Sequence, residues 1–459
     1  MNTISELLSN QRAFFKSQKT KNIAYRINIL KQLKAEIEAN EQAVYAALKA
    51  DFNKSEFETF ISEFGLVLSE LNLVINNLKR WIKPKRVKSS MLTFPSKSYI
   101  YKEPYGAVLV IAPWNYPFLL AIEPLIMAIA AGNTVIVKPS ELTKNTSQLI
   151  ANIIDKVFPE NLATTIQGGV DVTSELLEQK WDYIFFTGSI PVGKIVAKAA
   201  AKHLTPVTLE LGGKSPCIID DTVDVKLIAR RLTWGKFLNA GQTCIAPDYL
   251  IVKASVKLQL IEALKIEITK QYGDNPEKSP DFPRVINNKN LLRLENMLEG
   301  ANIIFGGTIN KKSRYCAPTL IDEPDLTSNI MQDEIFGPIL PILSYNNKND
   351  IETIIWNFEK PLALYIFSNT KPFIKQILNK YSFGGGAIND SLIHFGNHRL
   401  PFGGVGASGM GVYHGKHGFD TFSHNKAIIK RDNWADPSIR YAPYKGKLNL
   451  IKKVFKLFS

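Results

Sequence analysis

Cysteine is scarce in this chain of 459 residues. The three cysteines, Cys217, Cys244 and Cys316, are an odd number, lie far apart and form no CxxC pair. The sequence therefore indicates neither a disulfide-held scaffold nor a cysteine-rich zinc module. Free cysteines fit a reducing compartment, and we expect a cytoplasmic location.

Histidine is rare as well, and most of it is crowded late in the chain. Five of the six histidines are His394, His398, His414, His417 and His424. Their spacings do not include the HExxH pattern, which places two histidine ligands on one face of a helix. The sequence therefore predicts no bound metal.

The N-terminus lacks the basic segment, apolar block and small-residue cleavage site of a signal peptide, which argues against export. One stretch, residues 105–137, is apolar over a length that would span a bilayer, with Glu123 as its only charged side chain. Prolines, asparagines and a glycine divide it into pieces of strand and helix length. We therefore interpret it as the buried start of an α/β domain.

The formal net charge is +14, and half of it lies in residues 425–459, where nine Lys or Arg outnumber two Asp. No zinc finger, basic zipper or aromatic-rich RNA motif accompanies this charge, so nucleic-acid binding is not expected. Residues 445–458 mix lysines with apolar residues in a short helical pattern. Weak contact with an anionic membrane surface and a packed or disordered tail are alternatives that the sequence leaves open.

Hydrophobic periodicity predicts an α/β protein. Two long amphipathic helices, at 23–50 and 56–80, are expected to open the chain. Strands and helices then alternate, which indicates parallel sheets with crossover helices. The first series of strands is expected at 107–112, 134–138, 163–167, 182–186 and 206–211. The second series starts at Ser215 and continues at 248–253, 338–344, 362–368 and 384–389.

Cys244 differs from the other two cysteines, which lie in apolar surroundings and are expected to be core residues. It ends the segment Phe237-Leu-Asn-Ala-Gly-Gln-Thr-Cys244, in a loop after a helix. Backbone N–H groups of such a loop can face a substrate oxygen, and the position also favours a thiolate. Cys244 is therefore the candidate nucleophile.

Glu210 is the candidate base. It ends a predicted strand just before Gly212 and Gly213, at the sheet edge where α/β proteins bind ligands. A thiol can add to a carbonyl carbon, and a carboxylate held near it can remove a proton from the thiol or from a water. The plain alternative is a solvated carboxylate at the end of a strand.

The segments TLELGGKSP around Glu210 and GQTCIAPD around Cys244 resemble the two signatures of the NAD(P)-dependent aldehyde dehydrogenases. The second segment is similar to the class 3, or fatty aldehyde, branch. The resemblance implies that a medium- or long-chain aliphatic or an aromatic aldehyde is oxidised to the acid through a thiohemiacetal and a thioester on Cys244. It also implies that Asn115 and the Cys244 backbone N–H form the oxyanion hole. An enzyme that transfers the acyl group to coenzyme A and a noncatalytic NAD-binding relative are the alternatives.

The same resemblance implies the cofactor residues. Lys138 and Glu141 are expected at the adenosine ribose, Thr187, Gly188, Ser189 and Gly193 at the pyrophosphate, and Glu334 and Phe336 at the nicotinamide half. The turn from 185 to 193 is not the GxGxxG fingerprint, so taken alone it is a weak signal. Because a carboxylate at Glu141 would accept from a ribose 2′-OH and repel a 2′-phosphate, NAD is expected, with NADP as the alternative.

We expect a Rossmann-like cofactor domain, a second α/β catalytic domain and a small β bridging arm that joins two chains in a homodimer. The expected parts are 1–82 with 104–211 for the cofactor domain, 212–419 for the catalytic domain, 83–103 with 420–435 for the arm, and 436–459 for a basic C-terminal tail. Separate strands near 98–102 and 421–429 suggest the arm.

Overall fold

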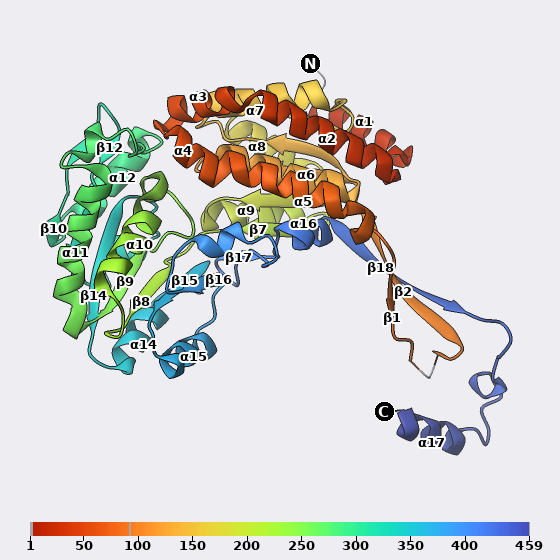
Figure 1. Ribbon diagram of the computed structural model, residues 1–459. Coiled ribbons are helices and arrows are strands. Elements are labelled where there is room, and N and C mark those ends of the chain that lie inside the picture. The colour runs from red at the N-terminus through yellow and green to blue at the C-terminus, as the bar shows by residue number, and fades with distance from the viewer. Residues whose placement is uncertain (1–2, 91–92, 459) are drawn as a thin grey trace.

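The computed structural model describes residues 3–90 and 93–458 and confirms the predicted α/β class (Figure 1). Of the helices at the N-terminal end, the first packs on the face of the first sheet that carries Leu109 and Ile111, and the others lie on the side of the opposite face. These helices are α1 (Ile4–Lys16), α2 (Ile23–Ala39), α3 (Glu41–Phe52), α4 (Glu56–Thr59) and α5 (Gly65–Trp81). The expected helix at 23–50 is wrong as one unit, because the chain turns at Asn40, which ends α2 and precedes α3. The helix α1 was not predicted.

The first sheet has six strands in the order β17-β7-β6-β3-β4-β5. Five are parallel, and the predicted first series is confirmed: β3 (Ala107–Ile111), β4 (Thr134–Lys138), β5 (Ala163–Thr165), β6 (Tyr183–Thr187) and β7 (Val207–Glu210). Their crossover helices are α6 (Pro117–Ala131), α7 (Lys144–Val157), α8 (Val170–Glu178) and α9 (Ile190–Ala201). The short β17 (Gly409–Met410) comes from much later in the chain and adds an antiparallel edge to β7.

The long apolar stretch forms the centre of this part of the molecule. All fifteen residues of α6 are buried, as are all residues of β3 and β4 on either side of it. The carboxylate of Glu63 accepts hydrogen bonds from the backbone N–H groups of Phe118 and Leu119 and so caps the start of α6. The interpretation as a buried domain start is therefore confirmed.

The second sheet has seven strands in the order β10-β13-β14-β9-β8-β15-β16. The six parallel strands are β8 (Pro216–Ile219), β9 (Tyr249–Lys253), β13 (Thr319–Asp322), β14 (Ile339–Tyr345), β15 (Ala363–Phe367) and β16 (Gly385–Ile388), and β10 (Ile303–Phe305) is antiparallel. Helices of this part are α10 (Val225–Phe237), α11 (Ala254–Tyr272), α12 (Asn288–Leu298), α13 (Asn329–Gln332), α14 (Lys348–Trp356) and α15 (Lys371–Lys380). The hairpin of β11 (Ile309–Asn310) and β12 (Tyr315–Cys316) lies beside them. None of the strands β10, β11, β12 and β13 was predicted.

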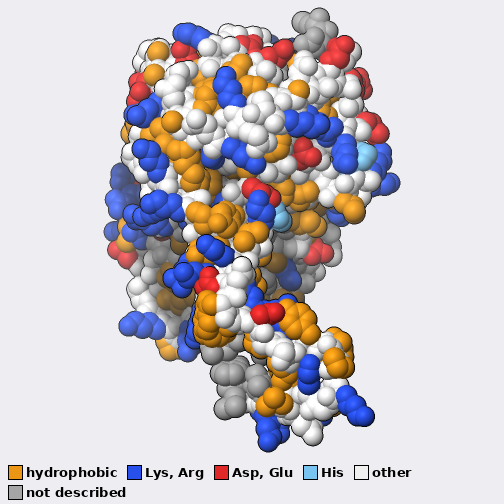
Figure 2. Space-filling view, turned by 90° about the vertical axis from the view of Figure 1, so that its right-hand side faces the viewer, with side chains coloured by type: hydrophobic (Ala, Val, Ile, Leu, Met, Phe, Trp, Pro, Cys, Tyr) orange, Lys and Arg blue, Asp and Glu red, His pale blue; other side chains and the backbone are white. Residues whose placement is uncertain are grey.

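A three-stranded sheet projects from the body as an arm (Figure 1). It pairs β1 (Lys85–Val87), β2 (Ser96–Pro104) and β18 (Ser423–Arg431), all antiparallel. The helix α16 (Gly415–Thr421) leads into β18, and α17 (Leu448–Phe458) ends the described chain below the arm. Figure 2 views the molecule from the side of this arm, whose surface carries both hydrophobic and basic side chains. None of the helices among the described residues is long and apolar enough to cross a membrane.

Candidate active site

The carboxyl ends of neighbouring parallel strands bring the predicted residues of the first sheet to one edge. In the strand register Ile111 of β3 stands opposite Lys138 at the end of β4, and Thr187 at the end of β6 stands opposite Glu210 at the end of β7. The loop that carries Asn115 follows β3 at the same edge. Ligands of open α/β sheets bind at such an edge.

Cys244 follows a turn with unusual backbone geometry. Asn239, Ala240 and Gly241 all have positive φ, of 53°, 51° and 73°. Such a run is strained for residues with a Cβ and must be held by its surroundings. At Gly241 a Cβ would lie 2.3 Å from the carbonyl oxygen of Gly337, so only glycine fits there.

Hydrogen bonds to buried side chains hold this turn. The carboxylate of Glu58 accepts from the backbone N–H of Asn239 at 2.8 Å. The side chain of Gln242 donates to the Asn239 carbonyl and accepts from the backbone N–H of Ile286 at 3.0 Å each. The hydroxyls of Tyr116 and Thr243 are 2.5 Å apart. The loop before Cys244 is therefore fixed by residues from three distant parts of the chain.

Asn115 is buried directly behind this turn. Its Nδ2 donates to the carbonyl oxygen of Gln242 at 3.1 Å, and its own carbonyl oxygen accepts from the Asn239 side chain at 2.7 Å. Asn115 does not belong to the described residues that line the adjoining cavity. The structure thus places the Asn115 amide against Gln242, which precedes Cys244 by two residues. Gln242 engages one of the two N–H groups of that amide.

A cavity of about 260 Å³ joins Cys244 to Glu210. Its few polar contributors include Ser62, Thr187 and Thr243. Most of the wall is aliphatic or aromatic: Ile61, Leu66, Tyr116, Leu119, Leu120, Trp234, Leu238, Ile245, Leu392, Ile393, Phe395, Phe402 and Tyr413. A nucleophile and a carboxyl group therefore share one cavity that is otherwise suited to an apolar molecule.

Glu210 is 2% exposed, and neither of its carboxyl oxygens has a hydrogen-bond partner within residues 3–90 and 93–458. Burial raises the pKa of this carboxyl well above its ordinary value. A carboxyl group with unengaged oxygens and a raised pKa is a stronger base than an ordinary carboxylate once it is ionised. This environment differs from the solvated strand-end carboxylate that was the alternative.

The thiol of Cys244 is partly accessible from the cavity. Burial raises its pKa above the ordinary value, and the carboxyl groups of Glu334 and Glu210 add to the rise. Hydrogen bonds from the backbone N–H groups of Cys244 and Ile245 oppose the rise without overcoming it. The expectation of a resting thiolate is therefore wrong for this structure: backbone N–H groups do face the sulfur, but desolvation dominates. The thiol needs a base before it can attack.

The residues predicted for the adenosine and pyrophosphate ends of the cofactor lie around β4 and the start of α9. The Lys138 ammonium pairs with the Glu141 carboxylate at 2.8 Å. The hydroxyl of Thr187 is buried and has no hydrogen-bond partner in the part of the chain that the structure describes. Ser189 precedes α9, and its side chain makes no capping bond to the described first turn, so the backbone N–H groups there remain open to an anion.

Gly193 lets this helix pack closely on the sheet. A Cβ at Gly193 would lie 2.6 Å from the Leu211 side chain, one residue beyond Glu210. Gly188 follows β6 and its backbone N–H donates to the carbonyl oxygen of Glu210 at 3.0 Å. The glycine pair therefore ties the start of α9 to the strand that carries the candidate base.

Glu334 and Phe336 belong to a loop that faces this edge from the second sheet. A Cβ at Gly212 would collide with the Glu334 carboxylate, so that carboxylate lies against the backbone just after β7. Burial raises the pKa of Glu334 to about 8, with Asp248 adding to the rise. The Phe336 ring meets Trp114 edge-on at 5.2 Å between centroids. The loop after β3 and the Glu334 loop are thus in contact.

Three supporting residues were missed by the sequence analysis. Arg293 donates to the carbonyl oxygen of Ile335 at 2.7 Å, and Asp248 accepts from the Ile335 backbone N–H at 3.0 Å. Lys214 pairs with Asp248 at 2.7 Å and donates to two carbonyl groups near α13. Lys214 lies in the segment TLELGGKSP and Asp248 in GQTCIAPD, so their place in these segments could have identified them as site residues. No sequence feature identifies Arg293.

Comparison with known proteins gives a consistent set of similarities. A sequence model of the aldehyde dehydrogenase family matches residues 2–428. A 4,4'-diaponeurosporen-aldehyde dehydrogenase of Staphylococcus aureus is 48% identical over 458 residues, which cover 99% of this chain and 100% of the relative. Aldehyde dehydrogenase family 3 member A2 of Pongo abelii is 45% identical over 453 residues, 97% of this chain and 93% of the relative. A solved structure of substrate-bound Staphylococcus aureus AldH matches with a TM-score of 0.97 at 48% identity, covering 99% and 100% of the two chains.

Proposed function

The chain belongs to the aldehyde dehydrogenase family, with relatives in family 3, and on this premise we propose that it oxidises an apolar aldehyde to the carboxylic acid through a thioester on Cys244. The observation that carries the proposal is the shared cavity, in which the Cys244 thiol and the unengaged Glu210 carboxyl face an otherwise apolar space. The aldehyde chain would occupy that space, with its carbonyl carbon at the sulfur.

In the proposed reaction Glu210 first accepts the thiol proton, because burial leaves Cys244 protonated at rest. The thiolate then adds to the carbonyl carbon and forms a thiohemiacetal. Asn115 Nδ2 and the backbone N–H of Cys244 are the proposed donors to its oxygen anion, a type of donor whose loss typically costs about 10²- to 10³-fold in rate. After oxidation to the thioester, Glu210 releases the thiol proton to solvent, and the regenerated carboxylate removes a proton from the water that hydrolyses the thioester.

The family uses a nicotinamide dinucleotide, which when bound supplies the acceptor for the hydride that the aldehyde carbon loses. The proposed holding residues are Lys138 and Glu141 for the adenosine ribose, Thr187, Gly188, Ser189 and Gly193 for the pyrophosphate, and Glu334 and Phe336 for the nicotinamide side. The unpartnered Thr187 hydroxyl and the open first turn of α9 support this fit among the described residues. Glu141 supports NAD as the preferred cofactor, with NADP as the alternative.

The proposed domains correspond to the two large sheets and the arm. The cofactor part comprises 1–82 and 104–211, the catalytic part 212–419, and the arm 83–103 and 420–435. Residues 409–410 form β17 on the edge of the first sheet, so the late loop before the arm returns to the cofactor part. A cytoplasmic location and a contact of the tail 436–459 with a membrane surface stay predictions.

The test is a substrate panel with the purified full-length chain. Medium-chain, long-chain, polyene and aromatic aldehydes are compared by kcat/KM, each with NAD and with NADP. The apolar wall and the similarity to a 4,4'-diaponeurosporen-aldehyde dehydrogenase lead us to expect the highest kcat/KM with long apolar or polyene aldehydes. The carboxylate of Glu141 leads us to expect higher values with NAD. Cys244→Ala should abolish reduced-cofactor formation with every aldehyde.

Product analysis separates the alternative functions. Hydrolysis predicts the free acid as the product with or without coenzyme A, whereas an acylating enzyme would form the acyl thioester of coenzyme A. A noncatalytic relative would give no reduced cofactor with any aldehyde. Substantial turnover by Cys244→Ala, or a preference for small hydrophilic aldehydes, would contradict the proposal.

A further inference from the structure

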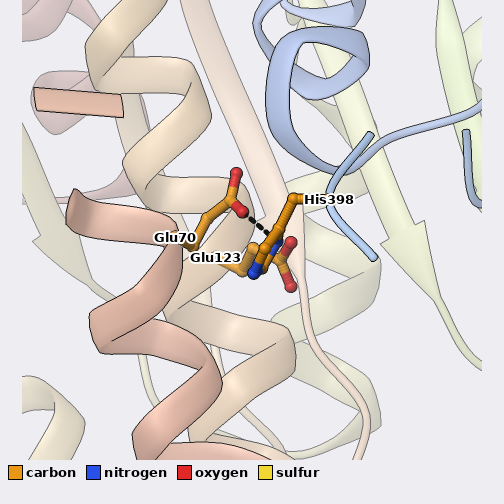
Figure 3. Close-up of side chains that lie close together, drawn as sticks. All are labelled: Glu70, Glu123 and His398. Atoms are coloured by element: carbon orange, nitrogen blue, oxygen red, sulfur yellow. Dashed lines mark ion pairs between the residues drawn. The ribbon is translucent and has the colours of Figure 1, made fainter. Parts of the chain in front are cut away.

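A second cluster of ionisable side chains lies outside the reaction cavity. Glu70 of α5, Glu123 of α6 and His398 of the loop before β17 each offer one donor atom, and these three atoms lie within 4.8 Å of one another. Figure 3 shows the three side chains pointing toward one another from separate elements. Residues that are far apart along the chain thus meet as two oxygen donors and one nitrogen donor.

Two of these side chains are carboxylates in a dry environment. Glu70 is 0% exposed and Glu123 is 2% exposed. Neither is paired with a lysine or arginine in the ion pairs of the described residues. The backbone N–H of Gly415 donates to Glu70 Oε1 at 2.9 Å, which leaves Oε2 to face His398. Buried carboxylates of this kind are usually paired or bound to a metal.

The contact between His398 and Glu70 is short enough for the two side chains to share a proton. His398 Nδ1 is 2.5 Å from Glu70 Oε2, and His398 Nε2 is 3.1 Å from the Ser69 hydroxyl. If Nε2–H donates to Ser69, Nδ1 keeps a lone pair, and a proton from the carboxyl group accounts for the short contact. An ion with bonds of about 2.0–2.2 Å would replace that proton and hold the two atoms further apart. A hydrogen bond from the outer ring nitrogen is how metal-binding histidines are commonly oriented.

An independent side chain is directed at the same place. His414 is 1% exposed, and neither ring nitrogen has a hydrogen-bond partner among the residues that the structure describes. Its Nε2 lies 3.6 Å from Glu123 Oε1, and that oxygen likewise has no hydrogen-bond partner in the described chain. Unengaged nitrogen and oxygen donors that face each other in a buried pocket are costly unless a ligand joins them.

We propose that Glu70, Glu123 and His398 bind a divalent first-row transition metal ion, with the His414 imidazole next to Glu123 at the edge of the site. Two carboxylates and one imidazole form a mixed oxygen and nitrogen donor set, which Zn²⁺ accepts at about 2.0–2.2 Å with a water or a further ligand completing four-coordination. Two negative charges balance the charge of the ion. The ion replaces any proton between His398 and Glu70, so binding releases protons.

The site would fasten one wall of the aldehyde cavity. His398 follows Phe395 and Gly396, which line the cavity, and the ring of His414 stacks on cavity-lining Phe402 at 5.1 Å. Glu70 and Glu123 are fixed on α5 and α6. A bound ion would therefore hold the loop around 395–402 against these two helices. The proposal concerns metal binding and does not depend on the reaction at Cys244.

The experiment uses the full-length chain carrying Cys244→Ser, because a partly accessible thiol could itself bind Zn²⁺. The protein is stripped with a chelator, dialysed and titrated with Zn²⁺ in a calorimeter. We expect saturable binding of one ion per chain. Because loss of an outer-shell partner costs about 10- to 100-fold in metal affinity, Ser69→Ala should weaken binding by that range and Glu123→Gln or His398→Gln by at least about 100-fold.

A matched control is His203→Ala, which removes an exposed histidine far from the cluster and should bind Zn²⁺ like its parent. Folding of each variant is checked by its near-ultraviolet circular dichroism. Co²⁺ provides a second readout, since its visible absorption reports an oxygen and nitrogen site without the charge-transfer band of a thiolate. The absence of saturable binding by the parent, or unchanged affinity in both Glu123→Gln and His398→Gln, would overturn the proposal in favour of a carboxyl–histidine pair that shares a proton.

Discussion

At the scale of single residues, Glu210 and Cys244 are both more protonated than they would be in water. Burial raises the pKa of each group, and their charges would also repel. A proton can therefore pass from the sulfur to the carboxylate only in the fraction of molecules in which Glu210 has lost its own proton. Because the pKa of Glu210 is raised, that fraction still grows at pH values where an ordinary glutamate is already fully ionised.

The first prediction concerns Glu210→Gln. An amide cannot accept a proton, so the steady-state kcat should fall by about 10²- to 10⁴-fold, the usual contribution of a general base. The rise of kcat with pH that the carboxyl causes should disappear in the variant. Stopped-flow measurement of reduced-cofactor formation across pH, with product analysis, checks both effects.

The matched control for this measurement is Glu175→Gln, which changes an exposed carboxylate on α8 and should leave the pH profile unaltered. Retention of the same pH-dependent rise in Glu210→Gln, under conditions where hydrolysis limits the rate, would remove Glu210 from the role of base. Another group, with Glu334 as the nearest candidate, would then have to be considered, since its pKa is raised to about 8.

At the scale of elements, the turn before Cys244 determines where the sulfur lies. Its three left-handed residues are stabilised by contacts from α4, from the loop after β3 and from the loop at 284–286. A strained turn of this kind persists only when its surroundings hold it. The position of the nucleophile therefore depends on packing from elements that contain no reacting atom.

The second prediction is that Gly241→Ala displaces Cys244. The φ of 73° alone disfavours alanine, and its Cβ would also meet the Gly337 carbonyl at 2.3 Å. We expect a loss of stability of more than about 1–3 kcal/mol, the usual cost of one strained residue, together with a large fall in kcat/KM. Thermal unfolding and steady-state kinetics measure the two effects.

Gly273→Ala serves as the matched control, because Gly273 has a similar φ of 80° and a Cβ there would meet nothing within 4 Å. It should show only the backbone cost and keep the parent kcat/KM. Equal effects of the two substitutions would mean that the contact with Gly337 does not position the nucleophile.

Much of the element order could be predicted from the sequence, and the misses have physical causes. The parallel strands of the first sheet can be recognised in the sequence as apolar runs, because both faces of the sheet are buried. The hydrophobic spacing continues without a gap from α2 into α3, so periodicity could not reveal the turn of the chain at Asn40. The two-residue strands β11 and β12 are too short to carry a period.

The candidate site shows the same division. Cys244, Glu210 and Asn115 stand in sequence segments that mark them. By contrast, Glu58 and Arg293 act by donating or accepting hydrogen bonds at backbone groups far away in the chain. Such roles depend on tertiary proximity, and residue type or spacing does not encode them. The cluster at Glu70 and Glu123 escaped the sequence analysis for this reason, because the search for metal sites considered only spacing between histidines.

At the scale of the whole molecule, the arm leaves the body with much of its surface uncovered. In the order β1-β2-β18, the strand β18 is an edge, and Ile428 and Ile429 on it are 40% and 57% exposed. Figure 2 shows hydrophobic side chains gathered on this side of the molecule. A long exposed edge with apolar side chains is a site for pairing with another chain. The homodimer expected from the sequence would use this surface.

The third prediction is that purified protein elutes as a dimer and that Ile428→Asp with Ile429→Asp shifts it to the monomer. Placing two charges on a surface buried between chains costs several kcal/mol, because the carboxylates lose their water. Size-exclusion chromatography with light scattering gives the mass directly. Val170→Asp changes an apolar side chain that is 75% exposed on α8 and should leave the dimer intact. A monomeric parent protein would contradict the expectation.

The cavity wall is assembled from pieces that are made at different times. Cys244 and Glu210 are complete when the chain reaches residue 244, but Leu392, Phe402 and Tyr413 still have to be synthesised. A growing chain therefore carries its sulfur without this part of the enclosure and leaves it open to oxidants and stray electrophiles. Shielding of the thiol and the ability to discriminate between substrates are acquired together, when the last sixth of the polypeptide folds back onto the rest.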